Sequence, residues 1–236
     1  MSTIKTVGSY EGFVELCSGY RGYNPGSPNL TVSALRELSV KARQTLEAFN
    51  VAKSEMSRVT NDREIAFAGL PKLVSGISFA LAASGASEQT MKDVRAFLRQ
   101  MTSRKKSRDP IPSGQSTEPE SNRPFSQRGY EAMTNHFAQL VQLVSLEPKY
   151  QPNEAHLTLA GLQEAVSNLR SLNQAVNDAR ATLSHARLAL RQVISGEVNS
   201  VVTTARAAKK YLRSVYGLNS NEYSQVREIK FNKTFW

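Results

Sequence analysis

Residues 23–37 read YNPGSPNLTVSALRE, and residues 150–164, which begin 127 positions later, read YQPNEAHLTLAGLQE. The tyrosine, the proline two positions on, the Leu-Thr pair, the next leucine and the glutamate recur at the same spacing. Two unrelated helix starts would not need this shared spacing, so the pattern predicts duplication of an ancestral unit. Further matches are Tyr10-Glu11 with Tyr130-Glu131, Gly85 with Gly217, and Val94 with Val226.

Both copies continue into a long apolar seam with steps of three and four residues, the spacing of a heptad helix. In the second copy every seam position over residues 162–193 is apolar. The first copy keeps the same register from Leu35 to Ala66, with Thr45 and Arg63 as polar interruptions. The shared register predicts two long helices that pack on each other about a pseudo-twofold axis.

The first long helix is expected over residues 29–68, ending at Gly69-Leu70-Pro71, because proline lacks the N–H that a helix interior needs. A second, returning helix should then run to about Ala83. The corresponding break in the second copy lies near Ser195-Gly196, where about five extra residues raise the offset from 127 to 132. Each copy then offers a glycine suited to a left-handed helix end and a short final helix: Gly85 with about 87–101, and Gly217 with about 219–229.

The predicted fold is therefore all-α: an elongated four-helix-type bundle of two similar helical hairpins with short accessory helices. Residues 1–101 form the first repeat and residues 128–236 the second, both in one bundle. Residues 102–127 are rich in proline, serine and basic side chains and have almost no apolar ones, so they predict a flexible linker.

Composition narrows the class of protein. The chain has 236 residues, a net charge of +10 and a single cysteine, Cys17, so no intramolecular disulfide can form. Its N-terminus lacks a signal-peptide pattern, and no run of about 18 apolar residues marks a membrane span. These features favour a cytoplasmic protein without a transmembrane segment, and leave open export without a cleaved signal.

Chemistry-bearing motifs are absent from the sequence. The histidines, His136, His156 and His185, have no metal-ligand spacing. Inward Glu-x-x-His pairs of di-iron bundles and glycine-rich phosphate loops are also missing. We expect Cys17 to be a small buried side chain. The sequence predicts no enzyme, no cofactor and no metal site.

Basic clusters are the main candidate sites for an anionic partner. Arg206, Lys209, Lys210 and Arg213 share one helix face, and Arg180 and Arg187 share a face of the preceding helix. As phosphate contacts they would give salt-dependent binding to nucleic acid. Alternatively, these cations form an ordinary solvated surface, or they contact an acidic protein surface.

The aromatic C-terminus is the candidate for self-association. Ile229, Phe231 and Phe235 alternate with polar residues, as in a strand, and Trp236 ends the chain. Phe231, Phe235 and Trp236 could dock on another subunit. Alternatively, the tail folds back on its own bundle.

The segment KKYLRSVYG (residues 209–217), followed by NEYSQV (221–226) and IKF (229–231), resembles the C-terminal signature of uncharacterised all-helical proteins of Bacteroidetes-type bacteria. This resemblance covers mainly the second repeat and implies a bacterial helical protein with no known activity. The sequence favours a non-enzymatic structural or interaction protein that self-associates into an oligomer or filament. The alternatives are a basic nucleic-acid-associated protein and, last, a membrane-active helical bundle.

Overall fold

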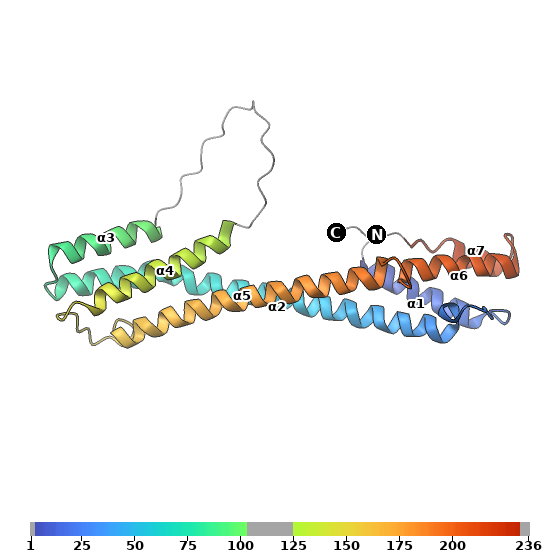
Figure 1. The fold of residues 1–236 in the computed structure, drawn as a ribbon, viewed down its shortest axis with the longest axis horizontal. Helices are drawn as coiled ribbons and strands as arrows, with labels where there is room; N and C mark the ends of the chain where they lie inside the picture. The colour runs from blue at the N-terminus through green and yellow to red at the C-terminus, as the bar shows by residue number, and fades with distance from the viewer. Residues whose placement is uncertain (1–2, 103–124, 232–236) are drawn as a thin grey trace, which may run out of the picture. The chain divides into compact units, whose positions relative to one another are not determined.

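The computed structural model describes residues 3–102 and 125–231, and within these ranges there are helices and no strand, which confirms the all-α prediction. Most of the predicted linker, 102–127, lies outside the described residues. In chain order the helices (Figure 1) are α1 (Thr3–Gly19), the short 3-10 helix η1 (Pro28–Leu30), α2 (Val32–Ala83), α3 (Glu88–Thr102), α4 (Phe125–Ser145), α5 (Leu159–Ser195), α6 (Val201–Tyr216) and α7 (Asn221–Arg227).

The chain forms two compact units. The terminal unit comprises Met1–Ser57 with Ala179–Trp236, and the middle unit comprises Arg58–Asp178. Each has its own hydrophobic core. Fully buried large side chains of the terminal unit include Tyr10, Phe13, Leu35, Leu190 and Leu212, and those of the middle unit include Ile77, Leu81, Phe137, Leu140 and Leu162. Each unit therefore draws on both sequence repeats.

The repeated Tyr-x-Pro segments make matching contacts in the two units. The Tyr23 hydroxyl donates a hydrogen bond of 2.7 Å to the Leu30 carbonyl. The Tyr150 hydroxyl donates to the Leu157 carbonyl, also at 2.7 Å. These bonds close the two loops that lead into α2 and α5, and they are compatible with the duplication hypothesis.

The long helices also begin alike. The Thr31 hydroxyl accepts the Ala34 N–H at 3.3 Å, and the Thr158 hydroxyl accepts the Gly161 N–H at 3.2 Å. Each threonine thus satisfies one of the backbone donors that a helix start leaves unpaired.

The buried positions of α1 match buried positions of α4 that lie 127 residues later in the sequence. Tyr10 and Phe137 are both fully buried, whereas Tyr130 is only half-buried. The other buried pairs at this offset are Phe13 with Leu140, Val14 with Val141, and Cys17 with Val144. The structural counterpart of Tyr10 is therefore Phe137, and the sequence match of Tyr10-Glu11 with Tyr130-Glu131 does not mark equivalent positions.

The predicted break at Gly69-Leu70-Pro71 is wrong, because α2 runs unbroken through Pro71 for 52 residues. A proline inside a helix removes one backbone hydrogen bond and costs about 3 kcal/mol. Leu70, Val74 and Ile77 are at most 3% exposed, and their packing in the middle core offsets this cost. The first copy therefore has one continuous helix instead of a hairpin.

The predicted break in the second copy is confirmed: residues 196–200 separate α5 from α6. Asn199 has a positive φ of 53°, and Ser200 begins α6 with a capping box to Thr203. In Figure 1, α6 continues onward from α5 and does not fold back against it. The expected hairpin is therefore absent here too.

Beyond this break the buried positions of α6 follow those of α2 at an offset of 131. The pairs are Leu70 with Val201, Val74 with Ala205, Ile77 with Ala208, and Leu81 with Leu212. The offset of 132 holds from Gly85 and Gly217 onward, as for Val94 with Val226. The break between α5 and α6 thus raises the offset between the repeats by four residues, and the end of α6 raises it by one more.

Both predicted helix-ending glycines have positive φ, 76° at Gly85 and 88° at Gly217. After α2, the N–H of Ala86 bonds the Leu81 carbonyl and the N–H of Gly85 bonds the Ala82 carbonyl, both at 3.3 Å. This pair of bonds is a Schellman motif. Gly217 has a ψ of 166°, which lies outside the left-handed helical region, so the two helix ends differ in detail.

Candidate functional site

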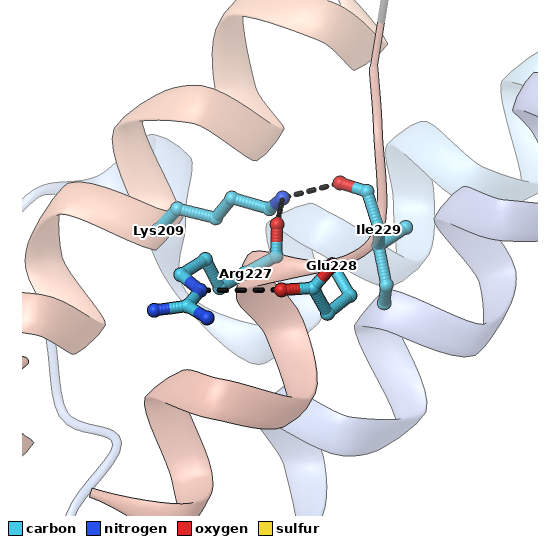
Figure 2. Close-up of polar contacts among 4 residues, drawn as sticks. All are labelled: Lys209, Arg227, Glu228 and Ile229. Atoms are coloured by element: carbon cyan, nitrogen blue, oxygen red, sulfur yellow. Dashed lines mark hydrogen bonds and ion pairs between the residues drawn. The ribbon is translucent and has the colours of Figure 1, made fainter. Parts of the chain in front are cut away.

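The basic face of α6 holds the C-terminal segment of the chain in place (Figure 2). The Lys209 ammonium donates to the Arg227 carbonyl at 3.3 Å and to the Ile229 carbonyl. The Arg206 guanidinium donates to the Phe231 carbonyl at 3.2 Å. Two of the predicted anion-binding side chains therefore bind carbonyl oxygens of their own chain.

Phe231 is a core residue of the terminal unit and is only 5% exposed. Its ring packs edge-on against Phe13 at 5.6 Å and Tyr10 at 6.2 Å, measured between centroids. The Lys209 ammonium lies 5.2 Å from the centroid of the same ring. Phe231 therefore follows the alternative in which the tail folds back on its own bundle, and it is not exposed as an anchor for a second subunit. Phe235 and Trp236 lie outside the described residues.

The side chain of Lys209 satisfies a carbonyl at the end of α7. Its cation only donates hydrogen bonds, and the Arg227 carbonyl is one that the helix end leaves without an intrahelical partner. The chain turns out of α7 after Arg227 and carries Phe231 into the core without forming a strand. Partial burial lowers the pKa of Lys209 below its ordinary value.

The other basic residues predicted to bind an anionic partner differ in their exposure to solvent. Lys210 and Arg213 point to the surface of α6, and Arg187 is exposed on α5. Arg180 is half-buried. The cluster therefore offers an external partner fewer cations than its helical spacing suggested.

A second basic face, on α3, was missed by the sequence analysis. Lys92, Arg95 and Arg99 are exposed and make no ion pair with any residue in the described ranges. Together with Leu98 they line an open concavity of about 520 Å³. Their spacing of three and four residues was the available signal. Glu88, one turn before Lys92, is the acidic residue on this face.

The last third of α2 carries an exposed face that the sequence analysis also missed. Ile65 is 73% exposed and Phe79 is 74% exposed. With small or polar residues between them, they form a row at steps of three and four, here called the α2 stripe: Ile65, Ala68, Lys72, Ser75, Phe79 and Ala82. Beside this row, Leu157 Cδ2 comes within 3.4 Å of the place a Cβ would take on Gly76, so a loop closes one edge.

The equivalent outer face of the second repeat is polar. At the offsets of 127 before the break and 131 after it, the matching residues are Gln192, Ser195, Thr203, Arg206, Lys210 and Arg213. The fold therefore accepts polar and charged side chains at these positions. Folding alone does not demand isoleucine and phenylalanine on the α2 stripe.

The hydropathy of α2 is unusual for an exposed helix. An 18-residue window of this helix has a mean hydropathy of 1.6 and is only 28% buried. By length and composition α2 could cross a membrane, which the sequence analysis did not anticipate.

Polar side chains also occur inside the middle unit. Arg63, 3% exposed, places its guanidinium carbon 4.2 Å from the centroid of the Tyr130 ring. The buried Asn173 amide donates to the Thr134 hydroxyl at 3.0 Å. The positions that match Arg63, Thr134 and Asn173 in the terminal unit hold Leu190, Val7 and Leu46, all buried. These three positions are thus polar in the middle unit and apolar in the terminal unit, whose own buried polar residues are Thr3, Thr6, Ser200 and Thr204.

The cysteine and the histidines lie at separate places in the described residues. No group of three or more His, Cys, Asp and Glu side chains there could hold a metal ion. Cys17 is fully buried, and burial raises its pKa from 9.0 to about 12, so its thiol stays protonated at neutral pH. His156 and His185 are exposed, and His136 is half-buried with its ring 6.5 Å from Phe97.

No protein-family model matches the chain, and searches of curated proteins and of solved structures give no match either. No likeness to a known protein therefore assigns a function to it.

Proposed function

We propose that this chain is a non-enzymatic structural or interaction protein that self-associates through the α2 stripe. The observation that carries the proposal is the exposure of Ile65 and Phe79 on one helix face. The matching face of the second repeat, with Gln192 and Lys210 at those positions, serves as an internal reference. Single exposed apolar side chains are common on protein surfaces, so what distinguishes these two is that they share one helix face whose counterpart in the second repeat is polar.

The expected association is weak and reversible. Covering a large apolar side chain stabilises by about 1.5–3 kcal/mol. Ile65 and Phe79 on two copies therefore contribute roughly 6–12 kcal/mol. Association itself costs about 4–15 kcal/mol in lost translational and rotational freedom. The protein should therefore be a monomer when dilute and associate as its concentration rises.

Light scattering over a concentration series tests the proposal. The wild-type mass should rise with concentration, and the double variant Ile65→Glu with Phe79→Glu should remain monomeric. The matched control, Gln192→Glu with Lys210→Gln, makes the same change in net charge on the polar counterpart face and should behave like the wild type. A monomer at every concentration, or a mass that the stripe variant leaves unchanged, would overturn the proposal.

The C-terminal tail is a second predicted route to association and is tested separately. Phe235 and Trp236 remain predicted association residues, although Phe231 is buried. Deleting Asn232–Trp236 and measuring the mass distinguishes tail-driven from stripe-driven association. If only the deletion lowers the mass, the tail and not the α2 stripe joins the copies.

We also propose that the two repeats arose by duplication. The matched Tyr23 and Tyr150 hydrogen bonds, both 2.7 Å long, support this origin, as do the paired buried positions. Duplication would explain why each unit contains the same set of helical segments. It would also have supplied two equivalent outer faces that later diverged, one to an apolar and one to a basic character.

Binding to a nucleic-acid backbone is the second candidate function. The exposed cations Lys92, Arg95 and Arg99 favour it, because they share one face and have no ion pair within the described ranges. Binding of a random-sequence duplex should weaken steeply with salt and fall when these three residues become glutamine. Absence of binding at low salt would exclude this function.

A further inference from the structure

We propose that the partner of the α2 stripe is the same stripe of a second copy, packed antiparallel about a twofold axis. This inference rests on the self-association proposed above and adds its orientation and register. The stripe spans residues 65–82, so the contact between the two helices is about 26 Å long at a rise of 1.5 Å per residue. All of it lies within the middle unit.

Side-chain size decides the orientation. Large residues occupy one heptad position, at Ile65 and Phe79, and small residues occupy the other, at Ala68 and Ala82. In an antiparallel pair whose twofold axis passes between positions 73 and 74, each residue faces the partner residue for which the two numbers sum to 147. Phe79 then faces the partner's Ala68, and Ile65 faces the partner's Ala82. Every large side chain meets a small one, as packing of ridges into grooves requires.

The central layer supports the same register. Lys72 faces the partner's Ser75, so the cation lies beside a hydroxyl group, and the partner's Lys72 lies one layer away, about 4.5 Å further along the axis. A parallel pair in register would instead place Lys72 against Lys72 and Phe79 against Phe79, while Ala68 would face Ala68. Such a pair puts both lysines in the same layer and alternates layers of two large side chains with layers of two small ones.

Lys72 also favours a second copy over a lipid bilayer as the occupant. The exposed ammonium stands in the middle of the stripe, seven residues from both Ile65 and Phe79. At the centre of a membrane span a lysine is costly, whereas between two helices its long stem can cover apolar surface while the charge reaches water. The bilayer remains an outcome of the test.

Disulfide trapping reads the orientation directly, because Cys17 is the only cysteine and is fully buried. Lys72→Cys and Ser75→Cys proteins are oxidised separately and as a mixture, at a concentration where the wild type associates. The mixture should yield at least tenfold more cross-linked dimer than either protein alone. Self-linking of Lys72→Cys at the same level as the mixture would show a parallel pair and overturn the inference.

A second test exchanges a large and a small side chain at two exposed positions of the stripe and measures association. Ala68→Phe alone should weaken association at least tenfold, because two phenylalanines then meet, and Phe79→Ala alone should also weaken it. The double variant restores a large-to-small contact and should recover most of the affinity. Failure of the double variant to recover affinity would contradict the register.

The outcomes separate the two proposals. A wild-type mass that rises with concentration but shows neither selective trapping nor rescue refutes the antiparallel register and leaves self-association standing. A wild type that stays monomeric refutes both. If the monomer binds phosphatidylcholine vesicles in a flotation assay and Phe79→Glu abolishes this binding, a bilayer covers the stripe instead.

Discussion

Replacing Lys209 by methionine tests whether the basic face of α6 holds residues 227–231 in place. Methionine keeps an unbranched apolar stem but removes the cation that binds the carbonyls of Arg227 and Ile229. A hydrogen bond from a charged donor contributes about 1.5–3 kcal/mol. Burial disfavours the charged form more strongly than its partners favour it, as the lowered pKa of Lys209 indicates, so the net contribution lies well below that of two such bonds. We expect Lys209→Met to lower the free energy of unfolding by about 1 kcal/mol.

The matched control is the neighbouring lysine. Lys210 is exposed on the same helix, so Lys210→Met makes the same change in charge and should cost less than about 0.5 kcal/mol. Urea unfolding gives the stabilities, and hydrogen exchange of residues 226–231 reports release of the C-terminal segment. Equal effects of the two substitutions, or unchanged exchange in Lys209→Met, would refute the reasoning.

The pH dependence of the same site has a definite sign. The pKa of Lys209 is lower in the folded than in the unfolded protein, so the folded state releases this proton first as pH rises. The contribution of Lys209 to stability therefore increases with pH between its lowered pKa and its ordinary value of 10.5. Lys209→Met should remove this increase.

Three further predictions concern the cores. Burial raises the pKa of Cys17 from 9.0 to about 12, so the protonated thiol stabilises the fold fully below pH 9 and this contribution is lost toward pH 12. Cys17→Val should change the free energy of unfolding at pH 7 by less than about 1 kcal/mol. It should also reduce the loss of stability at alkaline pH, which urea unfolding at pH 7 and in the alkaline range measures. An equal alkaline loss in the variant would contradict this. Tyr23→Phe and Tyr150→Phe should each cost about 1 kcal/mol in urea unfolding, because each removes one hydrogen bond, and a clear difference between them would argue against equivalent roles. Asn173→Leu with Thr134→Val should keep or raise the melting temperature, since replacing both partners avoids an unpaired group; a large loss would show that the buried hydrogen bond is essential for stability.

The repeat made much of the local structure predictable. The Tyr-x-Pro segment, the seam leucines and the terminal glycines each reflect a short-range requirement of a loop, a helix face or a helix end. These requirements act over a few residues, so they can be read from the spacing of residue types. Leu35 and Leu162, the starting points of the two seams, are both fully buried as their register indicates.

Tertiary packing explains what the sequence analysis missed. Pro71 normally ends a helix, but the buried neighbours Leu70 and Val74 hold α2 continuous. Lys209 lies on a basic face, and only the path of the chain after α7 brings carbonyl oxygens to it. Ile65 and Phe79 occur at helical spacing, which also suits a core, so their exposure became apparent only once the middle unit was assembled.

The division of the chain into units has a consequence for synthesis on the ribosome. The middle unit is one contiguous segment, Arg58–Asp178, whereas the terminal unit joins Met1–Ser57 to Ala179–Trp236. At about 5–20 residues per second, the N-terminal part emerges roughly 6–24 s before its C-terminal partner begins to appear. During this interval apolar side chains of α1 and early α2, among them Phe13 and Leu35, lack the groups that will cover them. All residues of the middle unit therefore emerge before the terminal unit can be completed, and the nascent N-terminal segment keeps its apolar side chains uncovered for longer.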